Sequence, residues 1–391
     1  MAELAYDVIP PELEKVVQKV SRFLAEKRPQ TPCLVVDLET VAERYQALKA
    51  AFPKTEIFYA VKANPADEVI STLIGEGASF DVASPAEIAL CLKLGAKPET
   101  LSYGNTIKKE ADIAKAFAQG VRMFAFDSAE ELEKLARAAP GARLFCRLRT
   151  DNSGAQVPLG RKFGCDAEMA YELLVRAREL GLVPYGICFH VGSQQTDPDK
   201  WDGAIHAAAG LFEALAATGI NLAIINLGGG FPARYREALQ TVDAYAQAID
   251  GSLKRHFGNR VPGAMLEPGR FLVGDAGILE SEVVLVARKS HAEDVRWVYL
   301  DVGRFGGLAE TEDAMIKYII KSGHDDEETG PVVLAGPTCD TADILYDAGL
   351  YEMPLSLKAG DKVHFLSAGA YTQTYASIAF NGFEPFKAYY I

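Results

Sequence analysis

Short apolar runs alternate with longer amphipathic stretches along most of this 391-residue chain. Eight of these runs are short enough to be strands, as in Ile57-Phe58-Tyr59-Ala60-Val61. They predict strands over 57–61, 79–82, 100–103, 122–126, 144–149, 185–190, 223–227 and 264–267. Apolar residues at helical spacing between them predict helices over 85–94, 108–119, 129–138, 167–180 and 201–218.

Eight strands separated by helices are what a closed parallel barrel of the (β/α)₈ type, the TIM barrel, requires. A doubly wound open sheet is the alternative, because alternation alone does not distinguish the two architectures. The chain is also longer than one ordinary core supports, so we expect a second domain.

The pattern changes after about residue 270. Segments 279–290, 295–302, 332–335 and 362–366 are strand-like, with Gly, Pro and Asp between them and little helical periodicity. A helix predicted over 11–27 and a strand over 33–38 are expected to join this β-rich region. The predicted domains are therefore a barrel over 40–268 and a discontinuous β-rich domain made of 1–39 and 269–391.

Composition excludes several classes of protein. A hydrophobic content of 49% with 24% charged residues is typical of a globular chain. The apolar runs are too short for a membrane span, and the first residues show no export signal, so we expect a cytoplasmic protein without a membrane partner. Six cysteines without a CxxC pair argue against disulfides and a metal site. The net charge of −13 disfavours nucleic acid and suits a cationic substrate.

Lys62 ends the first apolar run, within Tyr59-Ala60-Val61-Lys62-Ala63-Asn64. A lysine dehydrated in such a setting has a lowered pKa, and its neutral amine can form a Schiff base. The alternative is an edge-strand lysine whose ammonium group simply reaches water.

Two further strand ends predict a phosphate site. Gly228, Gly229 and Gly230 follow the seventh strand, and Glu267-Pro268-Gly269-Arg270 ends the eighth. Barrels bind phosphate near these two loops, where glycines allow backbone N–H groups to approach an anion and arginine adds a guanidinium. Taken alone, the three glycines would more often be a turn.

Other strand-end and loop residues suggest additional roles. His190 could lie against an aromatic ring and Ser193 could reach a phosphate oxygen, although a single histidine is usually structural. Glu267 could keep a pyridine nitrogen protonated, and its alternative role is an ion pair with Arg270. Cys339, beside Asp340, is either a proton donor or buried filler. A tyrosine at 371 could donate to a phosphate.

Together these segments resemble the fold-type III pyridoxal-phosphate decarboxylases, specifically the ornithine decarboxylase group. The resemblance covers nearly the whole chain, in order. Its motifs are YAVKAN at 59–64, FDVAS at 80–84, RKFG at 161–164, FHVGS at 189–193, LGGGFP at 227–232, EPGR at 267–270, GPTCD at 336–340, GAYT at 369–372 and FNGF at 380–383.

The resemblance implies an alanine-racemase-like barrel with a β-domain, working as a homodimer whose active sites are shared between subunits. It implies that Lys62 carries pyridoxal 5'-phosphate as a Schiff base and that Cys339 of the partner chain reprotonates the substrate Cα. The implied cofactor-binding residues also include His190 and Glu267 at the ring, Ser193, Gly228, Gly229, Gly230, Arg270 and Tyr371 at the phosphate, and Asp81, Glu87 and Arg147 as a polar shell. The implied substrate-binding residues are Asp301, Asp340 and Phe380.

Within this group, Asp340-Thr341 after Cys339 suits a substrate whose distal end is a bare ammonium. Diaminopimelate decarboxylases have a Cys-Glu-Ser pattern at this place, because the distal end of their substrate also bears a carboxylate. The resemblance thus implies decarboxylation of L-ornithine to putrescine in polyamine biosynthesis. Segment 301–311 departs from the eukaryotic pattern and resembles bacterial members, so a broad-specificity lysine/ornithine decarboxylase is one alternative. A catalytically inactive protein like the antizyme inhibitors is the other. The motifs also suggest an ion pair between Lys162 and Asp343 across the subunit interface.

Overall fold

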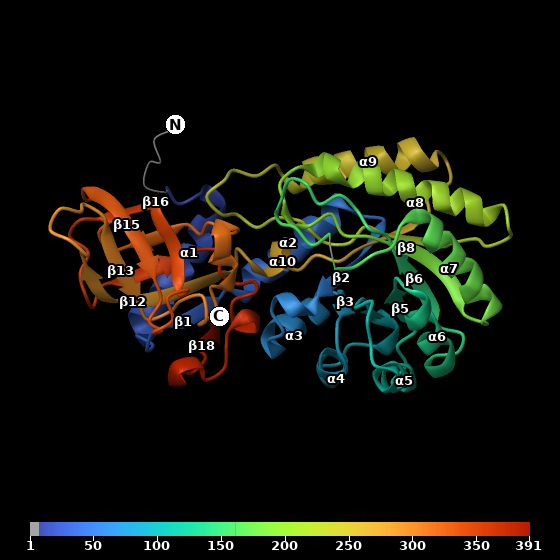
Figure 1. The fold of residues 1–391 in the computed structure, drawn as a ribbon, viewed down its shortest axis with the longest axis horizontal. Helices are drawn as coiled ribbons and strands as arrows, with labels where there is room; N and C mark the ends of the chain where they lie inside the picture. Colours follow the sequence, from blue (N-terminus) through green and yellow to red (C-terminus); the bar gives the residue numbers. More distant parts are fainter. Residues whose placement is uncertain (1–7, 161) are drawn as a thin grey trace. The chain divides into compact units, whose positions relative to one another are not determined.

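The computed structural model describes residues 8–160 and 162–391 (Figure 1). The chain divides into two compact units. A barrel unit contains residues 42–232 and 239–271, and a β-rich unit contains the residues up to 41, 233–238 and 272–391. Residues 233–238 were not expected in the β-rich unit, because this short segment carries no apolar period that would separate it from the barrel. Arg161 of the RKFG motif lies outside the described residues.

The barrel unit is built on eight parallel strands that close on themselves. Closure comes from β11, whose Ala264, Met265 and Leu266 pair with residues 55–57 of β2. The predicted (β/α)₈ barrel is therefore confirmed, and the open doubly wound sheet is wrong. Around the barrel the strands are β2 (Thr55–Ala60), β3 (Ser79–Val82), β4 (Leu101–Tyr103), β5 (Met123–Phe126), β6 (Arg143–Arg147), β8 (Val183–Cys188), β10 (Ile224–Asn226) and β11 (Gly263–Leu266).

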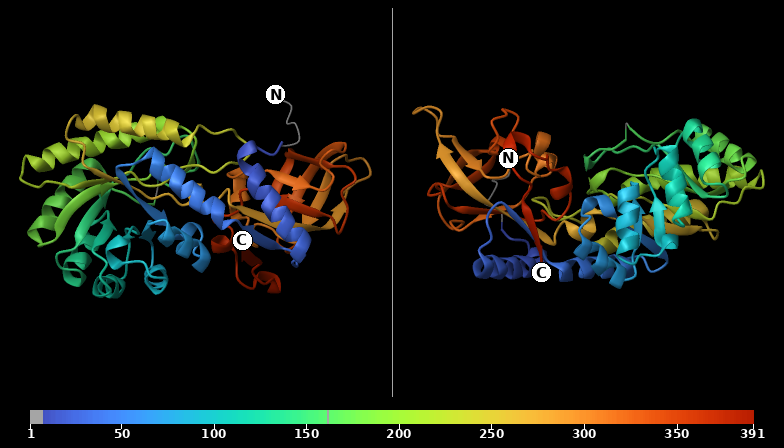
Figure 2. Two further views of the ribbon diagram at one scale, coloured as in Figure 1. Left: turned by 180° about the vertical axis from the view of Figure 1, so that it is seen from behind. Right: turned by 90° about the horizontal axis from the view of Figure 1, so that it is seen from below.

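Helices follow the barrel strands, and several begin at polar side chains that cap them. Ser84, Ser128 and Asp166 each accept a hydrogen bond from the backbone N–H three residues later, which satisfies an otherwise unpaired donor. α8 and α9 lie side by side on the outside of the barrel (Figures 1 and 2). The helices are α2 (Leu38–Ala51), α3 (Asp67–Gly75), α4 (Pro85–Lys93), α5 (Glu110–Ala118), α6 (Ala129–Ala138), α7 (Ala167–Glu179), α8 (Trp201–Ala216), α9 (Val242–Phe257) and α10 (Arg270–Val273).

The β-rich unit is organised around an eight-stranded sheet. Six of its strands follow the order β14-β17-β12-β13-β15-β16, β1 pairs with β12, and β18 pairs with β1. Helix α1 (Pro11–Lys27) packs Val16 and Val20 against Val35 and Ile278 of this sheet. Its strands are β1 (Cys33–Val36), β12 (Gly277–Ala287), β13 (Arg296–Leu300), β14 (Ile320–Ser322), β15 (Thr329–Ala335), β16 (Ile344–Pro354), β17 (Lys362–Phe365) and β18 (Lys387–Tyr390).

Some elements were not predicted. β16 runs for 11 residues, yet Asp347, Ala348 and Gly349 in its middle are exposed, so it lacks a continuous apolar signal. A short hairpin of β7 (Ala155–Val157) and β9 (Ser193–Gln195) was also missed. All six cysteines are free. Among the described residues, no cluster of three metal-ligating side chains occurs, and no helix is long and apolar enough to cross a membrane.

Candidate active site

Lys62 lies just beyond the carboxyl end of β2. The strand ends at Ala60, and Val61–Ala63 form a 3₁₀ turn that the Tyr59 hydroxyl fastens by donating to the carbonyl oxygen of Asn64 at 2.8 Å. Lys62 is exposed at this position. The expected dehydration of its amine by an apolar strand is therefore wrong, because the residue has already left the strand. Its charge instead acts on carboxylates at neighbouring strand ends.

Asp81, on the adjacent strand β3, is the most deeply buried of these carboxylates. It is 6% exposed, and its Oδ1 has no hydrogen-bond partner among the described residues. Burial, helped by the negative charge of Glu267, raises the pKa of Asp81 well above its usual range, while the charges of Lys62 and Arg147 oppose the shift. A Cβ at Gly104 would overlap this carboxylate, so glycine is required there.

Glu87 lies in the first turn of α4. Its Oε2 accepts the backbone N–H of Ala83 at 2.6 Å, which anchors the loop after β3. Burial raises the pKa of Glu87, and the Ala83 hydrogen bond and the charge of Lys62 oppose that shift. Arg147, at the end of β6, packs its guanidinium 5.2 Å from the ring centre of Phe163 in the RKFG segment.

His190 follows β8 and is held as a neutral ring. Its Nδ1 accepts the backbone N–H of Gly192 at 3.0 Å, so the ring proton belongs on Nε2. Burial and the positive charges of Arg147 and Lys62 lower the pKa of His190 well below its usual value. Its carbonyl oxygen accepts from the side chains of Thr150 (2.7 Å) and Asn152 (3.0 Å).

The three glycines after β10 form a tight cradle. Gly228 (φ +68°) and Gly230 (φ +107°) adopt left-handed conformations that favour glycine. A Cβ on Gly229 would lie 2.5 Å from the carbonyl oxygen of Glu267 and 3.3 Å from Nε2 of His190. A side chain at this position would fill the space beside both residues.

The side chains of Arg270 and Ser193 contact each other in the barrel unit. Arg270 is 3% exposed, and its Nε and Nη2 donate to the Ser193 hydroxyl at 3.3 and 3.2 Å. A buried guanidinium beside a hydroxyl offers donors to an anion. Glu267 accepts a hydrogen bond from Asn226 at 2.5 Å.

Sequence reasoning missed Asn226 and Gly104. Both lie directly beside a predicted strand end, Asn226 two residues before Gly228 and Gly104 immediately after Tyr103. Their position on the barrel edge was therefore available from the strand pattern. The roles of Asn226 and Gly104 could not be predicted, because the residues that they contact, Glu267 and Asp81, are distant in sequence.

The remaining predicted residues belong to the β-rich unit. Cys339 and Asp340 are exposed on the loop after β15. The Cys339 N–H donates to Oδ1 of Asn381 at 3.0 Å, which joins the GPTCD loop to the FNGF segment. Tyr371 packs 5.4 Å from Tyr375, ring centre to ring centre. That Cys339, Asp340 and Tyr371 serve the same active site as the residues of the barrel unit stays a prediction.

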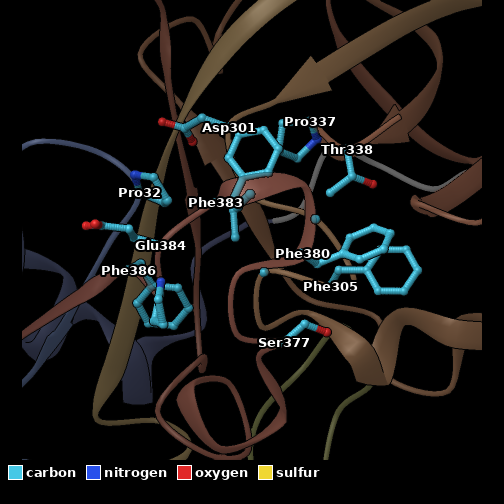
Figure 3. Close-up of a pocket in the computed structure, with 14 residues that line it drawn as sticks. Pro32, Asp301, Phe305, Pro337, Thr338, Ser377, Phe380, Phe383, Glu384 and Phe386 are labelled. Atoms are coloured by element: carbon cyan, nitrogen blue, oxygen red, sulfur yellow. The ribbon is translucent and has the colours of Figure 1, made fainter. Parts of the chain in front are cut away.

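A cavity of about 60 Å³ in the β-rich unit brings two of the predicted substrate-binding residues, Asp301 and Phe380, together, whereas Asp340 is not among its lining residues (Figure 3). Asp301, Phe380 and Thr338 line it, and the rings of Phe305 and Phe380 pack with their centres 4.7 Å apart. One carboxylate oxygen of Asp301, Oδ1, is occupied by the Ser281 hydroxyl at 2.6 Å and the Glu282 N–H at 2.9 Å. The cavity is thus an aromatic-walled space with a fixed carboxylate at its edge.

The barrel residues fit pyridoxal phosphate. Lys62 provides a primary amine, the glycine cradle and Arg270 suit a phosphate, and Glu267 suits a pyridine nitrogen. The orphaned Oδ1 of Asp81 adds an unused acceptor near Lys62 and Glu267.

Comparison with known proteins identifies the same cofactor. The family model described as "Pyridoxal-dependent decarboxylase, pyridoxal binding domain" matches residues 38–274. The chain belongs to this family of pyridoxal-dependent decarboxylases, and its cofactor is pyridoxal phosphate.

Named relatives are amino-acid decarboxylases. The lysine/ornithine decarboxylase of Selenomonas ruminantium is 35% identical, covering 94% of this chain and 91% of the relative. The ornithine decarboxylase of Rattus norvegicus is 34% identical, covering 91% of this chain and 80% of the relative. A crystal structure of the Vibrio vulnificus lysine/ornithine decarboxylase complexed with cadaverine matches with a TM-score of 0.85 and 31% identity, covering 97% of this chain and 99% of that one.

Proposed function

We propose that the chain decarboxylates L-ornithine to putrescine and CO₂ in polyamine biosynthesis. The observation that carries this proposal is the set of cofactor-fitting groups at the barrel strand ends, together with Asp340 followed by Thr341 in the β-rich unit. Relatives at 34–35% identity act, by their names, on ornithine or on lysine and ornithine. A broad-specificity lysine/ornithine decarboxylase is the second candidate.

The barrel residues bind and orient the cofactor. Lys62 is the amine that carries it, while Arg270, Ser193 and the backbone of Gly228–Gly230 hold its phosphate. Tyr371 adds a hydroxyl to that phosphate. Bound pyridoxal phosphate supplies an electron sink for the charge left at Cα when CO₂ departs. His190 lies against the ring, and Asp81 and Arg147 complete the polar surroundings.

Glu267 keeps the ring nitrogen protonated. A carboxylate beside that nitrogen favours the pyridinium form, which accepts negative charge better than the neutral ring. Burial raises the pKa of Glu267, and the Asn226 amide, Lys62 and Arg147 oppose that rise by favouring its ionised form.

Cys339 returns a proton to Cα after CO₂ has left. Its thiol is exposed, so it is accessible to a reacting atom outside its own unit. Asp340 and Asp301 bind the distal ammonium of the substrate, and Phe380 packs against its methylene groups. Asp301 contributes through Oδ2, because Oδ1 is held by Ser281 and Glu282.

The protein works as a homodimer in the cytoplasm. The loop carrying Cys339 and Asp340 completes the site of the partner subunit. Its exposure supports this arrangement, and six free cysteines support a reducing compartment.

The test is a comparison of kcat/KM for ornithine, lysine, arginine and diaminopimelate. Ornithine should be preferred. Lysine, one methylene longer, should be discriminated by about 10–200-fold, the range one methylene provides. Near-equal values for ornithine and lysine would support the broad-specificity enzyme, and no turnover of any of the four would support an inactive binding protein. Borohydride treatment followed by peptide mapping should place the cofactor on Lys62, with Lys62→Ala as the control.

A further inference from the structure

Asn226 joins the carboxylate of Glu267 to the glycine cradle. It is the last residue of β10 and is 2% exposed. Its Nδ2 donates to Oε1 of Glu267 at 2.5 Å, and its Oδ1 accepts the backbone N–H of Gly228 at 2.9 Å. A backbone hydrogen bond joins the same two segments, because the Glu267 N–H donates to the Gly228 carbonyl oxygen at 2.9 Å.

The chemistry of these partners allows one orientation of the amide. Turning it by half a rotation would set the Asn226 oxygen against a Glu267 oxygen and its NH₂ against the Gly228 N–H. Two acceptors and two donors would then face each other. An ionised carboxylate in place of the amide could still accept from Gly228, but it could not donate to Glu267.

We propose that Asn226 is a positioning residue that holds Glu267 ionised and in place to bind the ring nitrogen of pyridoxal phosphate, and that couples this carboxylate to the Gly228 end of the phosphate cradle. The inference rests on the proposed role of Glu267.

Electrostatics in the barrel unit explain why Glu267 needs a neutral donor. Burial raises the pKa of Glu267, and the Asn226 hydrogen bond, Lys62 and Arg147 oppose that rise. Asp81, also buried, adds a carboxyl group nearby. Without the amide, Glu267 would take up a proton more readily, and the ring nitrogen would lose its carboxylate partner.

The substitution Asn226→Asp separates this role from a merely structural one. In its acid form the new side chain carries an O–H that can donate to Glu267, as the amide does. Once ionised it lacks that donor and adds a second negative charge. The variant should therefore behave like the wild type at low pH and fail as the pH rises. Asn226→Ala lacks the donor at every pH. Ile225→Val, on the same buried strand, is the packing control.

Two measurements on the purified proteins test the proposal without using turnover. The first is the dissociation constant of pyridoxal phosphate from about pH 6 to about pH 9, expressed relative to the wild type. Asn226→Ala should weaken binding by about ten- to hundredfold at all pH values, as expected for buried polar groups left unpartnered. Asn226→Asp should approach the wild type at low pH. Its binding should weaken by up to about tenfold per pH unit above the titration of the introduced carboxyl group, which is coupled to that of Glu267.

The second measurement is ¹⁵N NMR of cofactor labelled at the ring nitrogen. The wild type and Ile225→Val should show a protonated ring nitrogen throughout. Asn226→Ala should show loss of that proton, and Asn226→Asp should show it as the pH rises. The other charged or titratable groups around Glu267 are the same in all the proteins, so a pH dependence found only in Asn226→Asp comes from the introduced carboxyl group; they are Asp81, Lys62, Arg147, His190 and Cys188.

The two measurements test the role of Asn226 and the role of Glu267 separately. A pH-independent ratio for Asn226→Asp, or a fully protonated ring nitrogen in Asn226→Ala, would overturn the role of Asn226. A wild type whose ring nitrogen is unprotonated would instead overturn the proposed role of Glu267. Should Asn226→Ala fail to fold, the isosteric Asn226→Asp still decides through its pH dependence.

Discussion

The carboxylate of Asp343 accepts the hydroxyl of Thr338 at 2.7 Å, and this contact closes the loop that carries Cys339 and Asp340. The same carboxylate accepts the backbone N–H groups of Thr338 at 3.1 Å and Arg304 at 2.8 Å. Asp343 is only 2% exposed. Its carboxylate therefore organises the loop within its own chain, whereas the sequence suggested a pair with Lys162 of a partner subunit.

Substituting Asp343 by asparagine should lower the thermal stability of the protein. The change removes the charge that three N–H or O–H donors face, and each charge-assisted hydrogen bond contributes about 1.5–3 kcal/mol. We expect the Tm to fall by several degrees and kcat to fall with it, because the Cys339 loop loses its anchor. Thr338→Val, which removes one of the three bonds, should give a smaller decrease in Tm.

Lys162→Ala is the matched control for Asp343→Asn. Lys162 is exposed, so its loss should change stability by no more than about 0.5 kcal/mol if Asp343 acts within its own chain. A decrease in Tm and in dimer affinity as large as that of Asp343→Asn would favour the cross-subunit ion pair instead.

Sequence patterns predicted the barrel well because its strands are buried on both faces and appear as continuous apolar runs. The candidate site residues were found because strand ends and glycine turns are local features. Contacts between distant segments were not predictable in this way. Asn226 and Glu267 lie 41 residues apart, and Arg304 and Asp343 lie 39 apart. The position of Lys62 beyond the end of its strand was not predictable either, because the apolar residues of the strand continue through Val61 into the turn.

His190 should make stability depend on pH below its ordinary pKa. The native ring stays neutral because its pKa is lowered, whereas the unfolded chain takes up a proton below about pH 6.5. The unfolded state then binds more protons, so this contribution to stability is present above that pH and is lost as the pH falls. His190→Gln removes the titration, so the Tm of the wild type should fall more steeply than that of the variant below about pH 6.5.

The measurement is Tm of the cofactor-loaded protein at intervals between about pH 5 and about pH 7.5. Asp81 and Glu267 also titrate with shifted pKa values, but both are present in the two proteins, so the difference isolates His190. His291→Gln, at an exposed histidine, should give a curve parallel to the wild type. Parallel curves for wild type and His190→Gln would contradict the neutral assignment.

Cys339→Ala should separate loss of CO₂ from delivery of the proton. Without the thiol, CO₂ should still be released, but the proton should arrive slowly or at the wrong carbon. We expect kcat to fall by about 10²–10⁴-fold, the usual contribution of a positioned proton donor, with part of the product appearing as an aldehyde. Cys91→Ala, at a buried cysteine on α4, should leave the product as the diamine alone. Unchanged turnover with clean diamine in Cys339→Ala would make Cys339 a residue without a role in catalysis.

The last prediction concerns the sharing of active sites between two subunits. Lys62 belongs to the barrel unit, and Cys339 belongs to the β-rich unit. If each site takes Lys62 from one chain and Cys339 from the other, the variants Lys62→Ala and Cys339→Ala should complement each other when mixed. Every mixed dimer then holds one intact site and one site that carries both substitutions.

With equal amounts and free exchange, about half of the dimers are mixed, and about a quarter of the wild-type activity should return. The activity of each variant alone, measured at the same total concentration, sets the background. Native mass spectrometry of subunits of different mass, one of them isotopically labelled, must show that exchange has occurred. If the mixed dimer is present and its activity does not exceed the two backgrounds, then Lys62 and Cys339 of the same chain serve the same site, and the proposed sharing is wrong.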